Sequence, residues 1–263
     1  MQVKAKKSLG QNFLIDKNII KKIVDEANIQ KEDYVLEVGP GTGNLTEFIL
    51  EKNPKKLFVV EKDIKLIEIL KNKFQKKIII INEDILNVSE DLICEKKLIV
   101  FGNLPYNIST QILSKWITNN EKKMWFKSFI LMFQKEVADR IIAKTNCKNY
   151  GRLSILSNWK LNIEKIMDIS ASCFLPKPKI QSTLLKFYPK NNYLSFKNSK
   201  NLEKITRIFF NQRRKKIKQS FKKIFKKPEL ISDKLKIDLN LRPQNLTPEK
   251  YYLITKEYEN LNL

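Results

Sequence analysis

Short runs of β-branched and aromatic residues alternate with segments of helical spacing along the first 143 residues of the chain. The runs that predict strands are 34–38, 57–60, 78–81, 98–101 and 126–133. Helical spacing marks 45–51, 64–74, 109–117 and 134–143, and an earlier amphipathic helix begins near Asp16. Because strands that alternate with helices form a parallel sheet covered on both faces, we predict an α/β fold.

The pattern changes after a last predicted strand at residues 183–188. Lys, Asn and Ser dominate residues 189–200, and the remainder is helical and basic, interrupted by Pro228, Pro243 and Pro248. We therefore predict two domains. Residues 1–190 form the sheet domain, and residues 191–263 form a small all-α domain.

The net charge suits a protein that meets phosphate groups, but the position of the charge matters more than its total. There are 51 Lys and Arg against 28 Asp and Glu, a net charge of +23. A base-biased genome also raises Lys, Ile and Asn without selection for binding. The chain has only six arginines, however, and three of them fall within residues 207–214.

Aromatic residues are interleaved with this basic cluster, whose candidate RNA contacts are Arg207, Arg213, Arg214 and Lys215. We predict that the cluster lies on a helix that faces RNA. The alternative is a charged helix face that is merely solvated.

Several classes of chemistry are excluded or disfavoured by residue usage. The chain has no histidine, which removes the commonest general base and metal ligand. Cys94, Cys147 and Cys173 are far apart and odd in number, so neither a metal site nor a disulfide framework is expected. The basic N-terminus has no apolar leader, and no apolar run has the length of a membrane span. We expect a soluble cytoplasmic monomer that does not engage membranes.

A glycine loop follows the first predicted strand and leads into a helix. It reads Glu37-Val-Gly39-Pro-Gly41-Thr-Gly43-Asn44. Glycines let the backbone turn sharply and let a ligand approach main-chain N–H groups, and the ends of strands are where nucleotide-like ligands bind. Neither the dinucleotide fingerprint nor the phosphate-cradling glycine motif is present. The loop therefore favours a cofactor without phosphates.

Two carboxylates follow the next two strands. Glu61 stands about 20 residues beyond the loop, where an acidic residue takes ribose hydroxyls in nucleotide-binding sheets. Asp84 follows the third strand, where it can accept a hydrogen bond from an adenine amine. Each residue also fits a plainer role as the cap of the following helix.

The fourth strand ends in Phe101-Gly-Asn103-Leu104-Pro105-Tyr106-Asn107. Proline forces the preceding residue into extended geometry and donates no hydrogen bond, so the Leu104 carbonyl is free to face a cleft. That carbonyl and the Asn103 side-chain oxygen can accept both hydrogens of an amino group while Tyr106 stacks on its ring. Such a grip would make a conjugated amine nucleophilic without a general base. The alternative is a simple turn at the end of a strand.

These segments together resemble the ribosomal RNA adenine dimethylase family. The resemblance rests on residues 7–14, 37–43, 101–110, 134–140, 150–154 and 174–182, which occur in the family's order. It implies a Rossmann-like class I methyltransferase sheet with helices on both faces and S-adenosylmethionine as cofactor. The implied cofactor contacts are Asn12, Leu14, Gly39, Glu61, Asp84 and Asn103. It also implies that Asn103 lies near the reacting methyl group and that Phe174 stacks on the flipped target base opposite Tyr106.

Within the family, the segments around Gln134 and Tyr150 and the long basic C-terminal region are similar to the small-subunit branch. That branch dimethylates N6 of two adjacent adenosines in the 3′-terminal hairpin loop of 16S RNA during subunit maturation. The implied partner is therefore the small-subunit precursor. Two alternatives stay open: the sister branch that modifies large-subunit RNA, and a binding factor that keeps the fold without the activity.

Overall fold

The computed structural model describes residues 6, 10–118 and 124–261. Its strands are β1 Phe13–Leu14, β2 Tyr34–Val38, β3 Lys56–Glu61, β4 Ile79–Asn82, β5 Leu98–Asn103, β6 Phe126–Gln134, β7 Leu161–Ile169, β8 Phe174–Leu175 and β9 Ser182–Pro189. Its α-helices are α1 Lys17–Asp25, α2 Asn44–Glu51, α3 Ile64–Phe74, α4 Ser109–Thr118, α5 Lys135–Ile141, α6 Arg152–Lys160, α7 Lys200–Phe210, α8 Lys218–Ile224, α9 Pro228–Leu235 and α10 Pro248–Leu261. Short 3-10 turns lie at Gln75–Lys77, Glu90–Leu92, Ala171–Cys173 and Pro243–Asn245.

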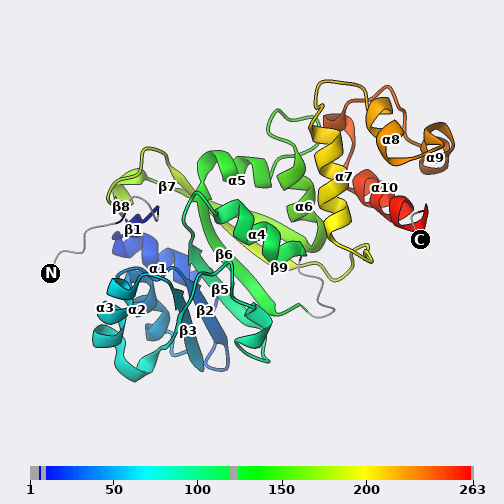
Figure 1. The fold of residues 1–263 in the computed structure, drawn as a ribbon. Coiled ribbons are helices and arrows are strands. Elements are labelled where there is room, and N and C mark those ends of the chain that lie inside the picture. The colour runs from blue at the N-terminus through cyan, green and yellow to red at the C-terminus, as the bar shows by residue number, and fades with distance from the viewer. Residues whose placement is uncertain (1–5, 7–9, 119–123, 262–263) are drawn as a thin grey trace. The chain divides into compact units, whose positions relative to one another are not determined.

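The large sheet has the strand order β4-β3-β2-β5-β6-β9-β7, with helices on both of its faces (Figure 1). Strands β2 to β6 run parallel, and β9 is antiparallel to β6. The order reverses between β2 and β5, which is the point where open α/β sheets bind ligands. The α/β fold predicted from the alternation of strands and helices is confirmed.

The central strands form because they are continuous apolar runs, as strands that are buried on both faces require. Val35, Val59, Ile99 and Phe101 are almost completely buried in one core cluster. Asp16 caps α1 by accepting hydrogen bonds from the N–H groups that follow it. The start of that helix therefore lies where the sequence predicted it.

Contacts divide the chain into two compact units. The first comprises the described residues of 1–112, 122–138 and 163–189, and the second those of 113–121, 139–162 and 190–263. The end of the sheet unit at Pro189 adjoins the predicted boundary at 190/191. The second unit also takes in two earlier segments, so it is discontinuous in sequence.

Aromatic side chains pack the second unit. Phe209 of α7 makes edge contacts with Phe221 of α8 and Tyr251 of α10, with ring centroids 5.7 and 5.4 Å apart. The predicted helical character of residues 191–263 is confirmed. No helix in the described part of the chain is long and apolar enough to cross a bilayer.

One prediction about this region is wrong. Arg207 lies on α7, but that helix ends at Phe210, and residues 211–215 form turns. Arg213, Arg214 and Lys215 therefore do not share a helix with Arg207. The run Asn211–Arg214 lacks the apolar side chains with which Ile205 and Phe209 hold α7 to its neighbours.

Candidate active site

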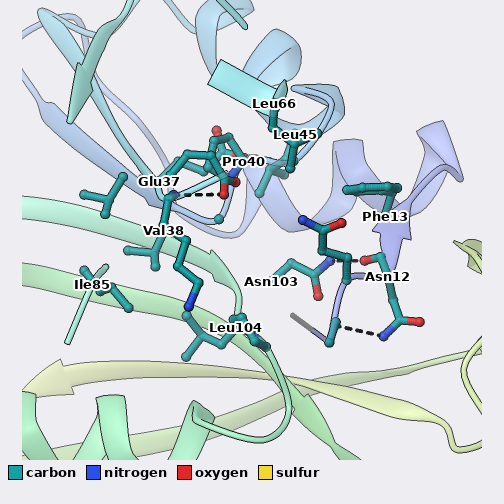
Figure 2. A pocket seen from close by; sticks show the side chains of 18 of the residues that line it. Asn12, Phe13, Glu37, Val38, Pro40, Leu45, Leu66, Ile85, Asn103 and Leu104 are labelled. Atoms are coloured by element: carbon teal, nitrogen blue, oxygen red, sulfur yellow. Dashed lines mark hydrogen bonds between the residues drawn. The ribbon is translucent and has the colours of Figure 1, made fainter. Parts of the chain in front are cut away.

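The main hollow of the first unit lies at the carboxyl ends of β2, β3 and β5. Its volume is about 960 Å³, including the part that is open to solvent. The lining includes the glycine loop, Glu61, Asp84 and Asn103, together with residues 10–14, which we call the N-terminal arm. Figure 2 shows Asn12 and Phe13 of the arm on one side of the hollow, with the Asn103 side chain directed toward them. The structure thus gathers the predicted cofactor residues around one cavity.

The glycine loop approaches the arm closely. Gly41 has a φ of +59°, and a Cβ atom at this position would lie 2.7 Å from the Phe13 ring. Only glycine combines this left-handed backbone with so close a neighbour. The Asn44 side chain also holds the arm, since its Nδ2 donates to the Leu14 carbonyl at 2.8 Å.

Glu61 ends β3 with its side chain in the hollow. Its Oε1 accepts hydrogen bonds from the N–H groups of Lys62 at 3.0 Å and Asp63 at 2.9 Å. Burial raises the pKa of the Glu61 carboxyl, and main-chain donors oppose the rise. The cap of α3 is Asp63, whose carboxylate accepts from the Lys65 N–H at 3.2 Å. The residue that caps α3 is therefore Asp63 and not Glu61.

Asp84 also lines the hollow, beyond the end of β4. Its Oδ1 accepts from the Leu86 N–H at 3.0 Å, and its Oδ2 lies 3.1 Å from the Lys62 ammonium. The carboxylate is thus held at the rim by a local turn and by an exposed ion pair. Asp84 therefore both stabilises a local turn and lines the hollow.

Glu37 is a functional candidate that the sequence reasoning did not assign. It is 2% exposed, lines the hollow, and accepts a 2.6 Å hydrogen bond from the Thr46 hydroxyl. Burial raises the pKa of Glu37 to about 7, and the nearby charge of Glu61 adds to the rise. The available signal was a single charged residue inside the apolar strand Tyr34–Val38.

The arm determines the orientation of the Asn103 amide. Asn103 Nδ2 donates to the Asn12 carbonyl at 2.7 Å, and the Asn12 side chain donates back to the Gly10 carbonyl at 3.2 Å. Since the amide nitrogen is occupied by a carbonyl, Oδ1 is the Asn103 atom that is available as an acceptor. In the described part of the chain, no hydrogen bond ends on the Leu104 carbonyl either.

Tyr106 connects the main hollow to a second one that is more open to solvent. The second hollow is lined by Gly10, Tyr106, Asn107 and Gln134. Gly10 and Tyr106 also line the first hollow, so the two cavities meet at these residues. Gln134 ends β6 and received no individual role from the sequence, although its segment contributed to the resemblance.

Phe174 is not brought into either hollow. Its side chain is 2% exposed and belongs to the core cluster that also contains Leu14. Its strand β8 pairs with β1 of the arm, in the register Leu14 to Phe174. To stack on a base, this ring would have to leave its packed position.

The predicted RNA-binding residues of the second unit differ in their exposure and in their hydrogen bonds. Arg207, Arg214 and Lys215 are exposed. Arg213 is only half-exposed, and its guanidinium donates to the Gln244 side chain and to main-chain carbonyls, including that of Lys148. Arg213 therefore ties segments of its own unit together. Among the described residues, no three His, Cys, Asp or Glu side chains gather as metal ligands.

The chain matches known proteins along nearly its whole length. Residues 2–260 match the family described as ribosomal RNA adenine dimethylase. The chain is 61% identical over 261 residues to the ribosomal RNA small subunit methyltransferase A of Pelagibacter ubique, covering 99% of each. It is 42% identical over 262 residues to the protein of that name from a Wolbachia of Drosophila simulans, covering 98% of this chain and 95% of the relative.

Solved structures agree with these sequence matches. A dimethyladenosine transferase from Plasmodium falciparum has a TM-score of 0.83 at 25% identity, covering 95% of this chain and 98% of the other. The 23S rRNA methyltransferase ErmE has a TM-score of 0.70 at 20% identity over 94% and 99%, which shows a shared fold. From the match over residues 2–260 and the relative at 61% identity, we conclude that the chain belongs to the ribosomal RNA adenine dimethylase family.

Proposed function

We propose that this protein transfers methyl groups from S-adenosylmethionine to N6 of two adjacent adenosines in the 3′-terminal hairpin loop of small-subunit ribosomal RNA. The observation that carries the proposal is the Asn103 amide, whose nitrogen is bound to the Asn12 carbonyl at 2.7 Å. Its oxygen is thereby available as an acceptor in the main hollow, which meets the second hollow at Gly10 and Tyr106. The names of the relatives, which are small-subunit methyltransferases, support this choice of RNA.

The main hollow fits S-adenosylmethionine chemically. Glu61 would take the ribose hydroxyls, Asp84 the adenine amine, and the backbone at Gly39 the amino-acid portion. Asn12 and Leu14 would contact it from the N-terminal arm. When bound, this cofactor supplies a methyl group on a positively charged sulfur, which needs no further activation by the protein.

Two acceptors at the end of β5 would prepare the target amine. An adenine amine is conjugated with its ring, so its lone pair is a poor nucleophile. The Asn103 Oδ1 and the Leu104 carbonyl would each accept one N–H, which favours a pyramidal nitrogen with its lone pair turned toward the main hollow. Positioning of this kind supplies most of the rate enhancement in a site without a strong base.

The remaining residues would hold the base and the RNA. Tyr106 would stack on the flipped adenine in the second hollow, as enzymes that modify bases require. When the N–C bond forms and the methyl–sulfur bond breaks, the target nitrogen would become cationic and acidic enough to lose its proton to water, in keeping with a chain that has no histidine. Exposed Arg207, Arg214 and Lys215 would bind phosphates.

Methyl transfer to purified immature subunits tests the proposal. The protein is incubated with radiolabelled S-adenosylmethionine and either small or large subunits. We expect label in the small subunit, at the two adenosines. Label only in large-subunit RNA would show that the protein acts as the sister branch does. Label in neither subunit would refute the proposal that the protein is a methyltransferase. Asn103→Ala should abolish transfer and leave subunit binding intact, whereas equal loss of both would show that its role is misassigned.

A further inference from the structure

We propose that Ser182 is a positioning residue that fixes the angle of the Tyr106 ring for stacking on the target adenine. Ser182 has this role only if the proposed function holds, because the ring needs a fixed angle only when a base enters beside it. No part of the mechanism above uses the Ser182 hydroxyl.

A short hydrogen bond joins the two side chains. The Tyr106 Oη lies 2.6 Å from the Ser182 Oγ, between residues 76 positions apart in the sequence, and either oxygen can donate. Ser182 is 0% exposed, whereas Tyr106 is half-buried and lines both hollows. The serine therefore holds the phenol end of a residue that lines both hollows.

The sheet holds the Ser182 end rigidly. Ser182 is the first residue of β9 and lies opposite Gln134 of β6 in the antiparallel register. The next N–H along, that of Lys135, donates to the Gln181 carbonyl at 2.9 Å. Because this hydroxyl sits on a paired strand, it has a fixed position relative to the end of β6.

The main chain of Tyr106 is held as well. The Ser109 hydroxyl donates to the Tyr106 carbonyl at 3.2 Å, and the Ile108 N–H donates to the Pro105 carbonyl at 3.1 Å. With its backbone and its phenol oxygen both bonded, the ring has a fixed long axis before a base arrives. Because a phenol prefers its hydrogen-bond partner in the plane of the ring, the bond to Ser182 also limits rotation of the ring about that axis. A ring set in advance places the adenine amine in line without an ordering cost at the moment of binding.

The position of the ring explains why its angle matters. Tyr106 and Gly10 are the residues shared by the two hollows, and Asn103 opens onto the first of them. A base stacked on Tyr106 would therefore turn its amine toward Asn103 by an amount that depends on the ring angle. Ser182 thus controls the approach of the amine without contacting the base.

The test is a double-mutant cycle of Ser182→Ala and Tyr106→Phe, measured as single-turnover methyl transfer to immature small subunits. Each single variant should slow transfer about tenfold, as loss of one buried hydrogen bond predicts. The double variant should be no slower than Tyr106→Phe alone, because the same bond is lost. The dissociation constant for S-adenosylmethionine should not change in any of them.

A matched control and a direct readout separate positioning from general damage. Ser128→Ala removes another buried serine of the same sheet, on β6 opposite Ile99, and should transfer at the wild-type rate. Ser182→Thr keeps the hydroxyl and should recover part of the rate. A hairpin RNA with 2-aminopurine at the target position should change its bound fluorescence in Ser182→Ala, because the stacking geometry changes.

Methyl transfer at the wild-type rate by Tyr106→Phe would overturn the inference, and this variant leaves the buried Ser182 unchanged. A double variant slowed by the product of the two single effects would also overturn it, since Ser182 would then act independently of Tyr106. Wild-type rates in both Asn103→Ala and Tyr106→Ala would instead refute the proposed function. The two failures are therefore distinguishable.

Discussion

Two glycines of the glycine loop provide a test of how tightly the loop is packed. Gly39 and Gly43 both have positive φ, at +68° and +78°. At Gly39 the nearest atom to an added Cβ is the Asn103 carbonyl oxygen, 3.8 Å away, which is ordinary contact. At Gly43 the added Cβ would lie 2.4 Å from the Phe74 ring and 3.1 Å from Leu70.

These distances set different magnitudes for the two alanine variants. Gly39→Ala carries only the left-handed backbone cost, about 1–2 kcal/mol. Gly43→Ala carries the same cost and also overpacks the core against Phe74, which adds about 1–3 kcal/mol. We therefore expect Gly43→Ala to lower the free energy of unfolding by about 2–5 kcal/mol, clearly more than Gly39→Ala.

Urea unfolding of the protein without cofactor measures this difference and separates it from binding. Gly151→Ala is the control, because Gly151 has extended backbone at φ −175° and its nearest neighbour would lie 3.9 Å away. That variant should change stability by less than about 0.5 kcal/mol. Equal losses in Gly39→Ala and Gly43→Ala would refute the role assigned to Phe74.

Three further predictions concern charge and packing. Replacing Arg214 and Lys215 by Gln should reduce the slope of log binding constant against log salt concentration by about 0.7–0.9 per lost phosphate contact; an unchanged slope would show that these residues do not contact RNA. Arg213→Gln should instead mainly lower the free energy of unfolding, by about 1–3 kcal/mol, because it breaks hydrogen bonds within its unit. Burial raises the pKa of the Glu37 carboxyl from 4.5 to about 7, so the folded protein binds this proton more tightly than the unfolded chain does. The free energy of unfolding should therefore fall as the pH rises from 4.5 through 7, and Glu37→Gln should flatten that fall. Phe174→Leu should change the free energy of unfolding by less than about 1.5 kcal/mol and should slow methyl transfer. Transfer at the wild-type rate would show that the Phe174 ring serves only to pack the core.

The sheet and much of the site could be predicted from the sequence because their signals are local. Buried parallel strands are continuous apolar runs, and the residues that follow them, such as Glu61 and Asn103, must meet at one edge. Strand β7 escaped prediction because it lies at the sheet edge, where exposed Glu164 and Lys165 break the apolar run.

What the sequence could not supply were pairings between distant segments. Nothing local indicates that the Asn12 carbonyl binds the Asn103 amide, 91 residues away, or that Tyr106 meets Ser182. The helix predicted through Arg213 failed for a related reason, since a run of basic residues does not reveal where tertiary packing stops supporting a helix. Phe174 shows the same limit, because a motif position does not reveal whether a ring faces a cavity or the core.

The discontinuous second unit has a consequence for protein engineering. Tyr150 is 0% exposed and donates to the Leu246 carbonyl at 2.8 Å, and Tyr252 donates to the Ile155 carbonyl at 2.9 Å. A chimera that exchanged only the segment after residue 190 with a relative would replace one side of each of these contacts and leave residues 139–162 facing a foreign partner. A functional graft must therefore transplant that inner segment together with the C-terminal helices.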